Sequence, residues 1–110
     1  MKEKDKISFE TVKGLIDKVK NWKLLEYKDL SDEFEGYLDD EDIKITVKKQ
    51  QDIGYSDYYI AVKYKGMHMF GCNAPEDQEY GRDIKKIFNK IDKGTYSSGK
   101  KRLEKIAKEK

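Results

Sequence analysis

The feature that most constrains the fold is residues 58–72, YYIAVKYKGMHMFGC, the only long run dominated by apolar, β-branched and aromatic residues. Two alternating segments flank Lys65 and Gly66, and glycine supplies the positive φ that a tight two-residue hairpin turn requires. The pattern therefore predicts a β-hairpin with Lys65-Gly66 at its turn. In that register the two strands pair Tyr64 with Met67, Val62 with Met69 and Ile60 with Gly71.

The two faces of the predicted hairpin differ in polarity. The side chains expected to face the core are Ile60, Val62, Tyr64, Met67 and Met69. The opposite face carries Tyr59, Ala61, Phe70 and Cys72, interrupted by Lys63 and His68. Because this second face is more apolar than a solvated face, we expect the C-terminal segment to cover it through Leu103 and Ile106, or the chain to self-associate there.

Helical periodicity appears near both ends of the chain. A first helix is expected to begin at the N-cap Ser8 and to run to about Asn21, with an apolar stripe made of Phe9, Val12, Leu15, Ile16 and Val19. A second helix is expected over residues 74–93, with Asn73 and Glu76 as a capping pair and Gly94 at its end. Its apolar stripe consists of Tyr80, Ile84, Ile87, Phe88 and Ile91.

Two further strands complete a predicted sheet. Residues 22–28 shift toward strand character, and residues 42–49 alternate cleanly with Ile43, Ile45 and Val47 inward. We therefore predict a two-layer α+β fold: an N-terminal helix, a four-stranded antiparallel sheet around the hairpin 58–72, and a C-terminal helix followed by a basic helical tail. Both main helices are expected on the face of the sheet that carries Ile60 and Val62.

Length and composition limit the chain to one domain with a small core. Of 110 residues, 36% are hydrophobic and 42% are charged. We expect a disordered N-terminus over residues 1–6, a single domain over residues 7–94, and a flexible joint with a basic extension over residues 95–110. One cysteine and one histidine exclude an internal disulfide and a zinc cluster, and no secretory or membrane-length apolar run is present. We expect a cytoplasmic monomer or homodimer without a membrane partner.

The charges are strongly segregated along the chain. Residues 29–42 contain eight acids and no Lys or Arg, and we expect them to form a loop between two strands. Residues 82–110 contain eleven Lys or Arg and four acids. If the two blocks lie apart in the fold, the molecule is a strong electric dipole.

Three patterns resemble catalytic or metal sites, and each lacks a decisive residue. Residues 94–101 have the spacing of a phosphate-binding loop, but Lys101 stands where Ser or Thr holds magnesium. Residues 31–42 have the spacing of a calcium loop, but Asp42 stands where a bidentate Glu is needed. His68 and Cys72 are about 13 Å apart along a strand, beyond hydrogen-bond reach. We therefore expect neither an enzyme nor a cofactor.

Two binding hypotheses remain. In the first, the chain is an inhibitor or adaptor that engages a protein partner, because aromatic anchors within a charged rim suit an interface. Its contact residues are predicted to be Asp32, Glu33, Phe34, Glu35, Tyr37, Asp39, Asp40, Tyr55, Tyr58 and Tyr59. In the alternative, the basic end follows a phosphate backbone of nucleic acid. The residues of this alternative site are Lys86, Lys90, Lys93, Lys100, Lys101, Arg102 and Lys105.

Overall fold

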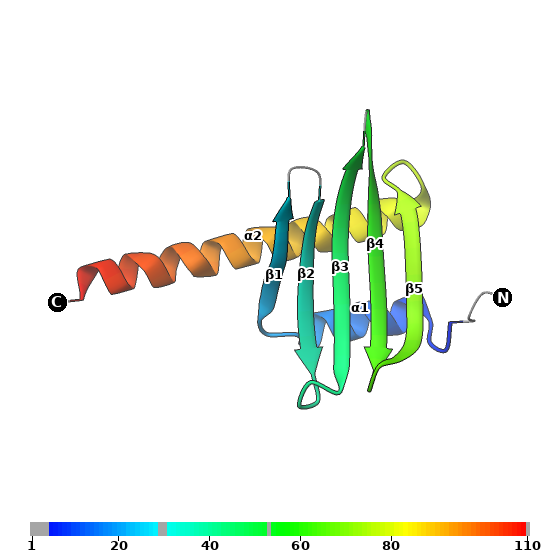
Figure 1. The fold of residues 1–110 in the computed structure, drawn as a ribbon, viewed down its shortest axis with the longest axis horizontal. Coiled ribbons are helices and arrows are strands. Elements are labelled where there is room, and N and C mark those ends of the chain that lie inside the picture. Colours follow the sequence, from blue (N-terminus) through cyan, green and yellow to red (C-terminus); the bar gives the residue numbers. More distant parts are fainter. Residues whose placement is uncertain (1–4, 29–30, 53, 110) are drawn as a thin grey trace.

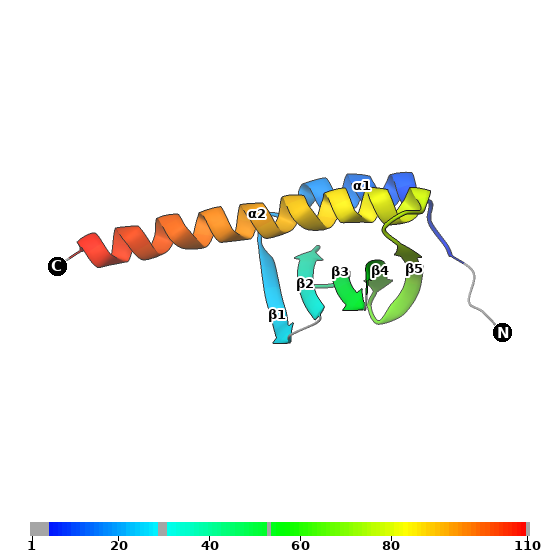
Figure 2. The same cartoon turned by 90° about the horizontal axis from the view of Figure 1, so that it is seen from above.

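The computed structural model describes residues 5–28, 31–52 and 54–109. The elements of this part follow one another as α1 (Phe9–Lys18), β1 (Trp22–Lys28), β2 (Ser31–Leu38), β3 (Ile43–Asp52), β4 (Tyr55–Tyr64), β5 (Met67–Pro75) and α2 (Glu79–Lys108). The strands form one antiparallel sheet in the order β1-β2-β3-β4-β5, so each strand pairs with its sequence neighbours. Both helices cover the same face of this sheet (Figure 1, Figure 2), which confirms the predicted α+β class.

The core lies between the sheet and the two helices. The sheet contributes Phe34, Ile45, Val47, Tyr58, Ile60, Val62 and Phe70, and the helices contribute Phe9, Val12, Ile16, Ile84, Phe88 and Ile91. Aromatic rings meet edge to face at its centre, where the Phe88 ring lies 5.4 Å from that of Phe34 and 6.0 Å from that of Tyr58. The predicted inward facing of Ile45, Val47, Ile60 and Val62 is therefore confirmed.

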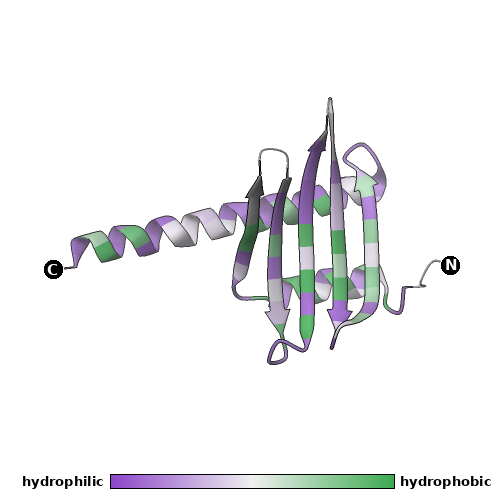
Figure 3. Cartoon of the chain, viewed as in Figure 1, coloured by the Kyte–Doolittle hydropathy of each residue, from purple (hydrophilic) through white to green (hydrophobic). Residues whose placement is uncertain are grey.

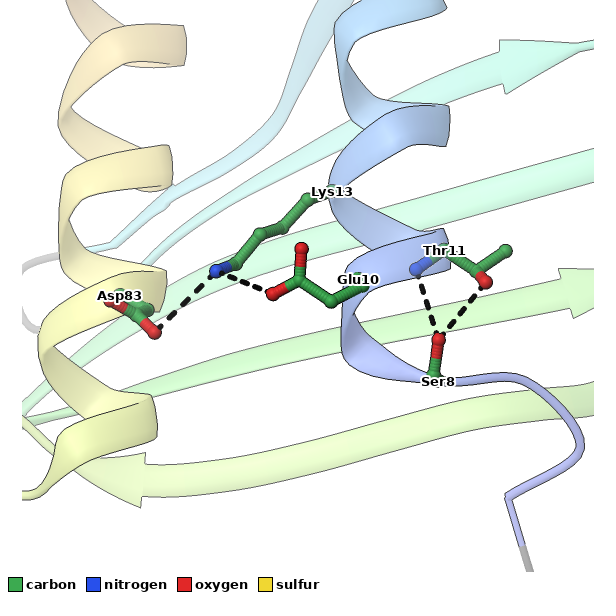
Figure 4. A network of polar contacts seen from close by, with 5 residues as sticks. All are labelled: Ser8, Glu10, Thr11, Lys13 and Asp83. Carbon is green, nitrogen blue, oxygen red and sulfur yellow. Dashed lines mark hydrogen bonds and ion pairs between the residues drawn. The ribbon is translucent and has the colours of Figure 1, made fainter.

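The start of α1 follows the sequence prediction. The backbone N–H of Thr11 donates a hydrogen bond to Oγ of Ser8 at 3.2 Å, which satisfies one of the free amides at the helix start (Figure 4). The helix ends at Lys18, before the predicted Asn21, because Val19 is already extended with φ −73° and ψ 124°. The short connection that follows leads directly into β1.

The prediction of four strands was wrong, because most of the acidic segment forms β2. Phe34 pairs with Val47 and is buried, while the acid Glu33 pairs with Lys48. Glu35 forms an ion pair with Lys44, with 3.3 Å between the carboxylate and Nζ. The acids that repel one another along the sequence are thus offset by lysines of the neighbouring strand, so the segment is stable as a strand rather than as a loop.

The second strand of the hairpin faces differently from the prediction. The turn itself is confirmed, since Lys65 and Gly66 have φ of 49° and 83°. Beyond the turn a β-bulge adds one residue, Met69, to β5. The pairings of Val62 with Met69 and of Ile60 with Gly71 were therefore wrong. Instead, Val62 pairs with Phe70, Ile60 with Cys72 and Ala61 with Gly71.

The chain before α1 is hydrogen-bonded to this bulge. The carbonyl of Met69 accepts hydrogen bonds from the backbone amides of Lys6 at 2.8 Å and Ile7 at 3.3 Å. Oδ1 of Asp5 accepts one from the amide of Gly71 at 3.0 Å and lies 3.1 Å from Nε2 of His68. Residues 1–4 of the predicted disordered N-terminus lie outside the described residues.

The second helix begins later and ends much later than predicted. Residues 73–75 belong to β5, so Asn73 and Glu76 form no capping box, and the N-cap is Gln78. Gly81 permits the end of β5 to lie against the first turn of α2, because a Cβ there would come within 1.7 Å of the Pro75 carbonyl oxygen. At the other end, α2 continues through Gly94 and through the predicted joint to Lys108.

Candidate functional site

The most prominent surface is the C-terminal part of α2, residues 94–108, which we call the projecting half of α2. The helix crosses the sheet, passes the edge strand β1 and extends beyond it (Figure 1, Figure 2). All residues from 96 to 109 are exposed, whereas Ile91 is buried. At 1.5 Å per residue, the projecting half is about 22 Å long.

Three large apolar side chains lie in solvent on the projecting half. The exposed fractions of Tyr96, Leu103 and Ile106 are 72%, 69% and 48%. At 100° per residue they lie within about 80° of arc, and Leu103 is rotated about 120° from Ile91. Ile106 has the same angular position as the buried Phe88, 18 residues earlier, but it lies on the part of α2 that extends beyond the sheet. Figure 3 shows hydrophobic bands near this end of the helix.

The cations of the predicted nucleic-acid site lie outside the arc of the exposed stripe. The seven cations of the predicted nucleic-acid site, Lys86, Lys90, Lys93, Lys100, Lys101, Arg102 and Lys105, all lie on α2. By helical periodicity, five of them, Lys86, Lys90, Lys93, Lys100 and Lys101, share an arc of about 100°. The projecting half is therefore a basic amphipathic helix.

A groove of about 740 Å³ lies between the C-terminal end of α1 and the middle of α2. Its apolar lining consists of Ile16, Val19, Trp22, Ile87 and Ile91. Its charged lining consists of Lys13, Lys20, Lys86 and Lys90, with Asp17 as the acid. Beyond the end of α1, the groove is lined by small residues of α2, namely Gly94, Thr95, Ser98 and Gly99.

One lysine of the groove lies at the contact between the helices. Nζ of Lys13 is 3.3 Å from a carboxylate oxygen of Glu10 and 3.8 Å from one of Asp83 on α2 (Figure 4). Hydrogen bonding to Glu10 raises the pKa of Lys13. Among the described residues, Lys20, Lys86 and Lys90 form no ion pair. The groove is thus apolar inside and positively charged along its sides.

The predicted acidic and aromatic site is divided among three places in the fold. Phe34 and Tyr58 are core residues, each only 1% exposed, so they are unavailable to a partner. The side chains of Glu33 and Tyr59 lie on the face of the sheet opposite the helices, together with those of Glu35 and Tyr37. Asp39 and Asp40 lie in the turn between β2 and β3, and Asp32 pairs with Lys49. The side chain of Tyr55 lies outside the described part of the chain.

The sheet face opposite the helices is polar, contrary to the expectation of an apolar second face. Phe70 and Cys72 were expected there, but the bulge turns them toward the helices, where the Phe70 ring stacks on Phe9 at 5.8 Å. Leu103 and Ile106 do not cover this face either, because α2 lies on the other side (Figure 2). Its shallow hollow of about 380 Å³ is lined by Glu33, Lys44, Thr46, Lys48, Gln50, Asp57, Tyr59, Ala61, Lys63 and Asn73.

Two side chains of the sheet, those of Tyr37 and Cys72, have raised pKa values. The phenol of Tyr37 donates a hydrogen bond to Glu35, which raises the pKa of Tyr37 to about 12. Burial raises the pKa of the Cys72 thiol, with a smaller contribution from Asp5. His68 lies opposite Lys63 while Cys72 packs against the core, so the two residues point to different faces of β5.

Sequence reasoning missed the groove and Tyr96. The groove depends on the packing of α1 beside α2, for which no local signal exists. Tyr96, Leu103 and Ile106 are seven and three residues apart, a spacing that was readable in the sequence. The flexible joint predicted at the start of residues 95–110 nevertheless separated Tyr96 from the other two. The helix joins them into one surface.

The chain matches no family model, no curated protein and no solved structure. Within residues 5–28, 31–52 and 54–109, no group of three or more His, Cys, Asp or Glu side chains is placed to hold a metal ion. In the same residues, no helix has the length and apolar character needed to span a membrane.

Proposed function

We propose that the chain is a non-enzymatic binding protein, an inhibitor or adaptor, and that the projecting half of α2 is its docking element for a protein partner. The observation that supports this is the exposure of Tyr96, Leu103 and Ile106 on a run of thirteen helical residues, 96–108, all of which are exposed. A helix of this length is marginal on its own in water. Burial of its apolar stripe in a partner would stabilise both the helix and the complex.

The chemistry of the partner follows from the rest of the helix surface. An amphipathic helix binds by placing side chains at i, i+3, i+4 or i+7 spacing into an apolar groove. Here the stripe is flanked by Lys100 on one side and Arg102 on the other, so a groove with acidic sides suits it best. The acidic segment has a smaller part in this proposal than the sequence suggests, because its anchor Phe34 is buried.

The test is a comparison of the full chain with a variant in which Tyr96, Leu103 and Ile106 are all replaced by serine. Each chain is used to capture proteins from a nuclease-treated cell extract, and the affinity of a captured protein is then measured by calorimetry. We expect the triple variant to bind at least about 100-fold more weakly, since three exposed apolar side chains contribute about 3 kcal/mol when buried. Met67→Ser is the matched control, because Met67 is 58% exposed but lies at the start of β5, away from α2 in the sequence.

The outcome that contradicts the proposal is equal affinity of the triple variant and the full chain. In that case the partner contacts another surface, and the projecting half has no part in docking. A loss of affinity in Met67→Ser as large as that in the triple variant would lead to the same conclusion.

A second candidate function, nucleic-acid binding, is favoured by the five lysines that share one arc of α2. Five phosphate contacts predict that the logarithm of the binding constant falls with the logarithm of salt concentration with a slope of about −4 to −5. The triple serine variant would keep this binding, whereas replacement of Lys93, Lys100 and Lys101 by serine would reduce both the affinity and the slope. Titration of generic duplex and single-stranded nucleic acid therefore separates the two functions.

A further inference from the structure

We infer that the groove between α1 and α2 binds an acidic amphipathic helix of a partner protein. The inference rests on the proposed binding function and adds a second docking surface to it, whose lining includes no residue of the exposed stripe. Three features of the groove support it: its length, its shape and its charge.

The length of the groove matches a short helix. Its lining extends along α2 from Lys86 to Gly99, which corresponds to about 20 Å at 1.5 Å per residue. A helix of about 13 residues has this length. Because α1 ends at Lys18 while α2 continues to Lys108, the occupant would lie beside α2 where α1 leaves it uncovered (Figure 1).

The shape of the groove permits close approach of a helix. Gly94 and Ser98 are one turn apart on the wall that continues beyond α1, and a Cβ at Gly94 or Gly99 would meet nothing within 4 Å. Small side chains on facing surfaces let two helices pack at the short end of the usual 8–10 Å interaxial distance. The apolar lining around Trp22 and Ile87 then receives the large side chains of the occupant.

The charge of the groove selects the occupant. Lys20, Lys86 and Lys90 line it, and periodicity places Lys101 and Lys105 further along the same side of α2. Asp17 is the acid of the lining. Complementary potentials favour a negatively charged helix, and the projecting half of a second copy is repelled because it is itself basic. The apolar interior distinguishes the site from one for phosphates, which require polar contacts.

The test uses the full-length chain to select from a displayed library of randomised 16-residue peptides. The expected enriched peptides carry Asp and Glu, together with apolar residues at i, i+3 or i+4 and i+7. A synthetic copy of the most enriched peptide is then titrated with the full chain and its variants by fluorescence anisotropy. Backbone amide shifts of the chain in the same titration should move first at Trp22, Ile87 and Gly94.

The decisive variant is the double replacement Gly94→Met and Gly99→Met. Methionine is a better helix former than glycine, and a Cβ at either position meets nothing within 4 Å in the free chain, so the variant should fold at least as stably. Its side chains occupy the space of the bound helix, and we expect at least tenfold weaker peptide binding. Gly14→Met is the matched control, because Gly14 lies on α1, meets nothing within 4 Å and does not line the groove.

The outcomes separate this inference from the proposed function. Enrichment of basic or unpatterned peptides, no enrichment, or equal peptide affinity of the double methionine variant would overturn the inference while leaving the projecting half untouched. The triple serine variant at Tyr96, Leu103 and Ile106 should bind the acidic peptide like the full chain, because none of these three residues lines the groove. The proposed function fails in a different measurement: the triple serine variant would bind the captured protein partner as tightly as the full chain does.

Discussion

Removal of the projecting half of α2 should leave the domain stable. The perturbation is a chain that ends at Thr95. Residues 96–109 are exposed, and the last fully packed residue of the helix is Ile91, which is 5% exposed. Stability is lost mainly where buried contacts, caps or hydrogen-bond networks are removed, and none of the deleted residues is buried. We therefore expect the shortened chain to lose under about 1 kcal/mol in total.

Phe88→Ala provides the opposite comparison on the same helix. Phe88 is 3% exposed and its ring meets those of Phe34 and Tyr58 edge to face. A buried Phe replaced by Ala costs about 3–5 kcal/mol from lost burial and the remaining cavity. Residues 79–93 of α2 thus contribute several times more to the free energy of unfolding than the projecting half, although the two parts are of similar length.

The assay is urea unfolding followed by far-UV circular dichroism, with Trp22 fluorescence as a second probe. For the shortened chain we expect an almost unchanged midpoint and an m-value close to that of the full chain, because the deleted residues bury little surface. A loss above about 2 kcal/mol together with a smaller m-value would refute the reasoning, since it would mean that the projecting half packs on the domain.

Two further predictions concern the sheet. The folded-state pKa of Tyr37 is about 12, above its ordinary 10.0, so its hydrogen bond to Glu35 stabilises the fold fully below pH 10 and is lost as the pH rises through 12. NMR titration should give a Tyr37 midpoint near 12 that falls toward 10 in Glu35→Gln, and a midpoint near 10 in the unchanged chain would contradict this. Gly36→Ala places a Cβ 2.7 Å from Cγ1 of Val19, so we expect a loss of about 1–3 kcal/mol in urea unfolding. Gly14→Ala should instead gain about 0.5–1 kcal/mol, and equal effects at the two sites would refute the steric argument.

Local signals in the sequence were sufficient for several elements. The Ser8 cap, the Lys65-Gly66 turn and the alternation of Ile43, Ile45 and Val47 each depend on residues within a few positions of one another. The same short-range patterns placed both helices on the correct face of the sheet. Elements of this kind are predictable because propensity and polarity point to the same structure.

Other features depend on residues far apart in the sequence. The alternation of Phe34, Gly36 and Leu38 is masked by the surrounding acids, whose lysine partners lie on β3. The bulge at Met69 has no signature in β5, and part of its hydrogen bonding comes from Lys6 and Ile7. Such features cannot be inferred from one segment, because the compensating interaction lies in another.

The continuity of α2 was missed for an energetic reason. Gly94 lowers helix stability by about 1 kcal/mol relative to alanine, which is enough to end a free helix but not one already nucleated by a packed half. The candidate surfaces depend on this continuity. The exposed stripe requires the helix to extend past Gly99, and the groove requires α1 to lie beside it.

The simple strand order has a consequence for how the chain acquires its structure during synthesis. Each strand pairs with the one made just before it, so the sheet can grow hairpin by hairpin from the N-terminus with few long-range contacts. The residues of α2 that cover the sheet, from Ile84 to Ile91, are made after all five strands. A nascent chain with a finished sheet therefore still exposes part of its apolar face to solvent. Synthesis of residues 79–91 is the step that closes the core and ends this vulnerable period.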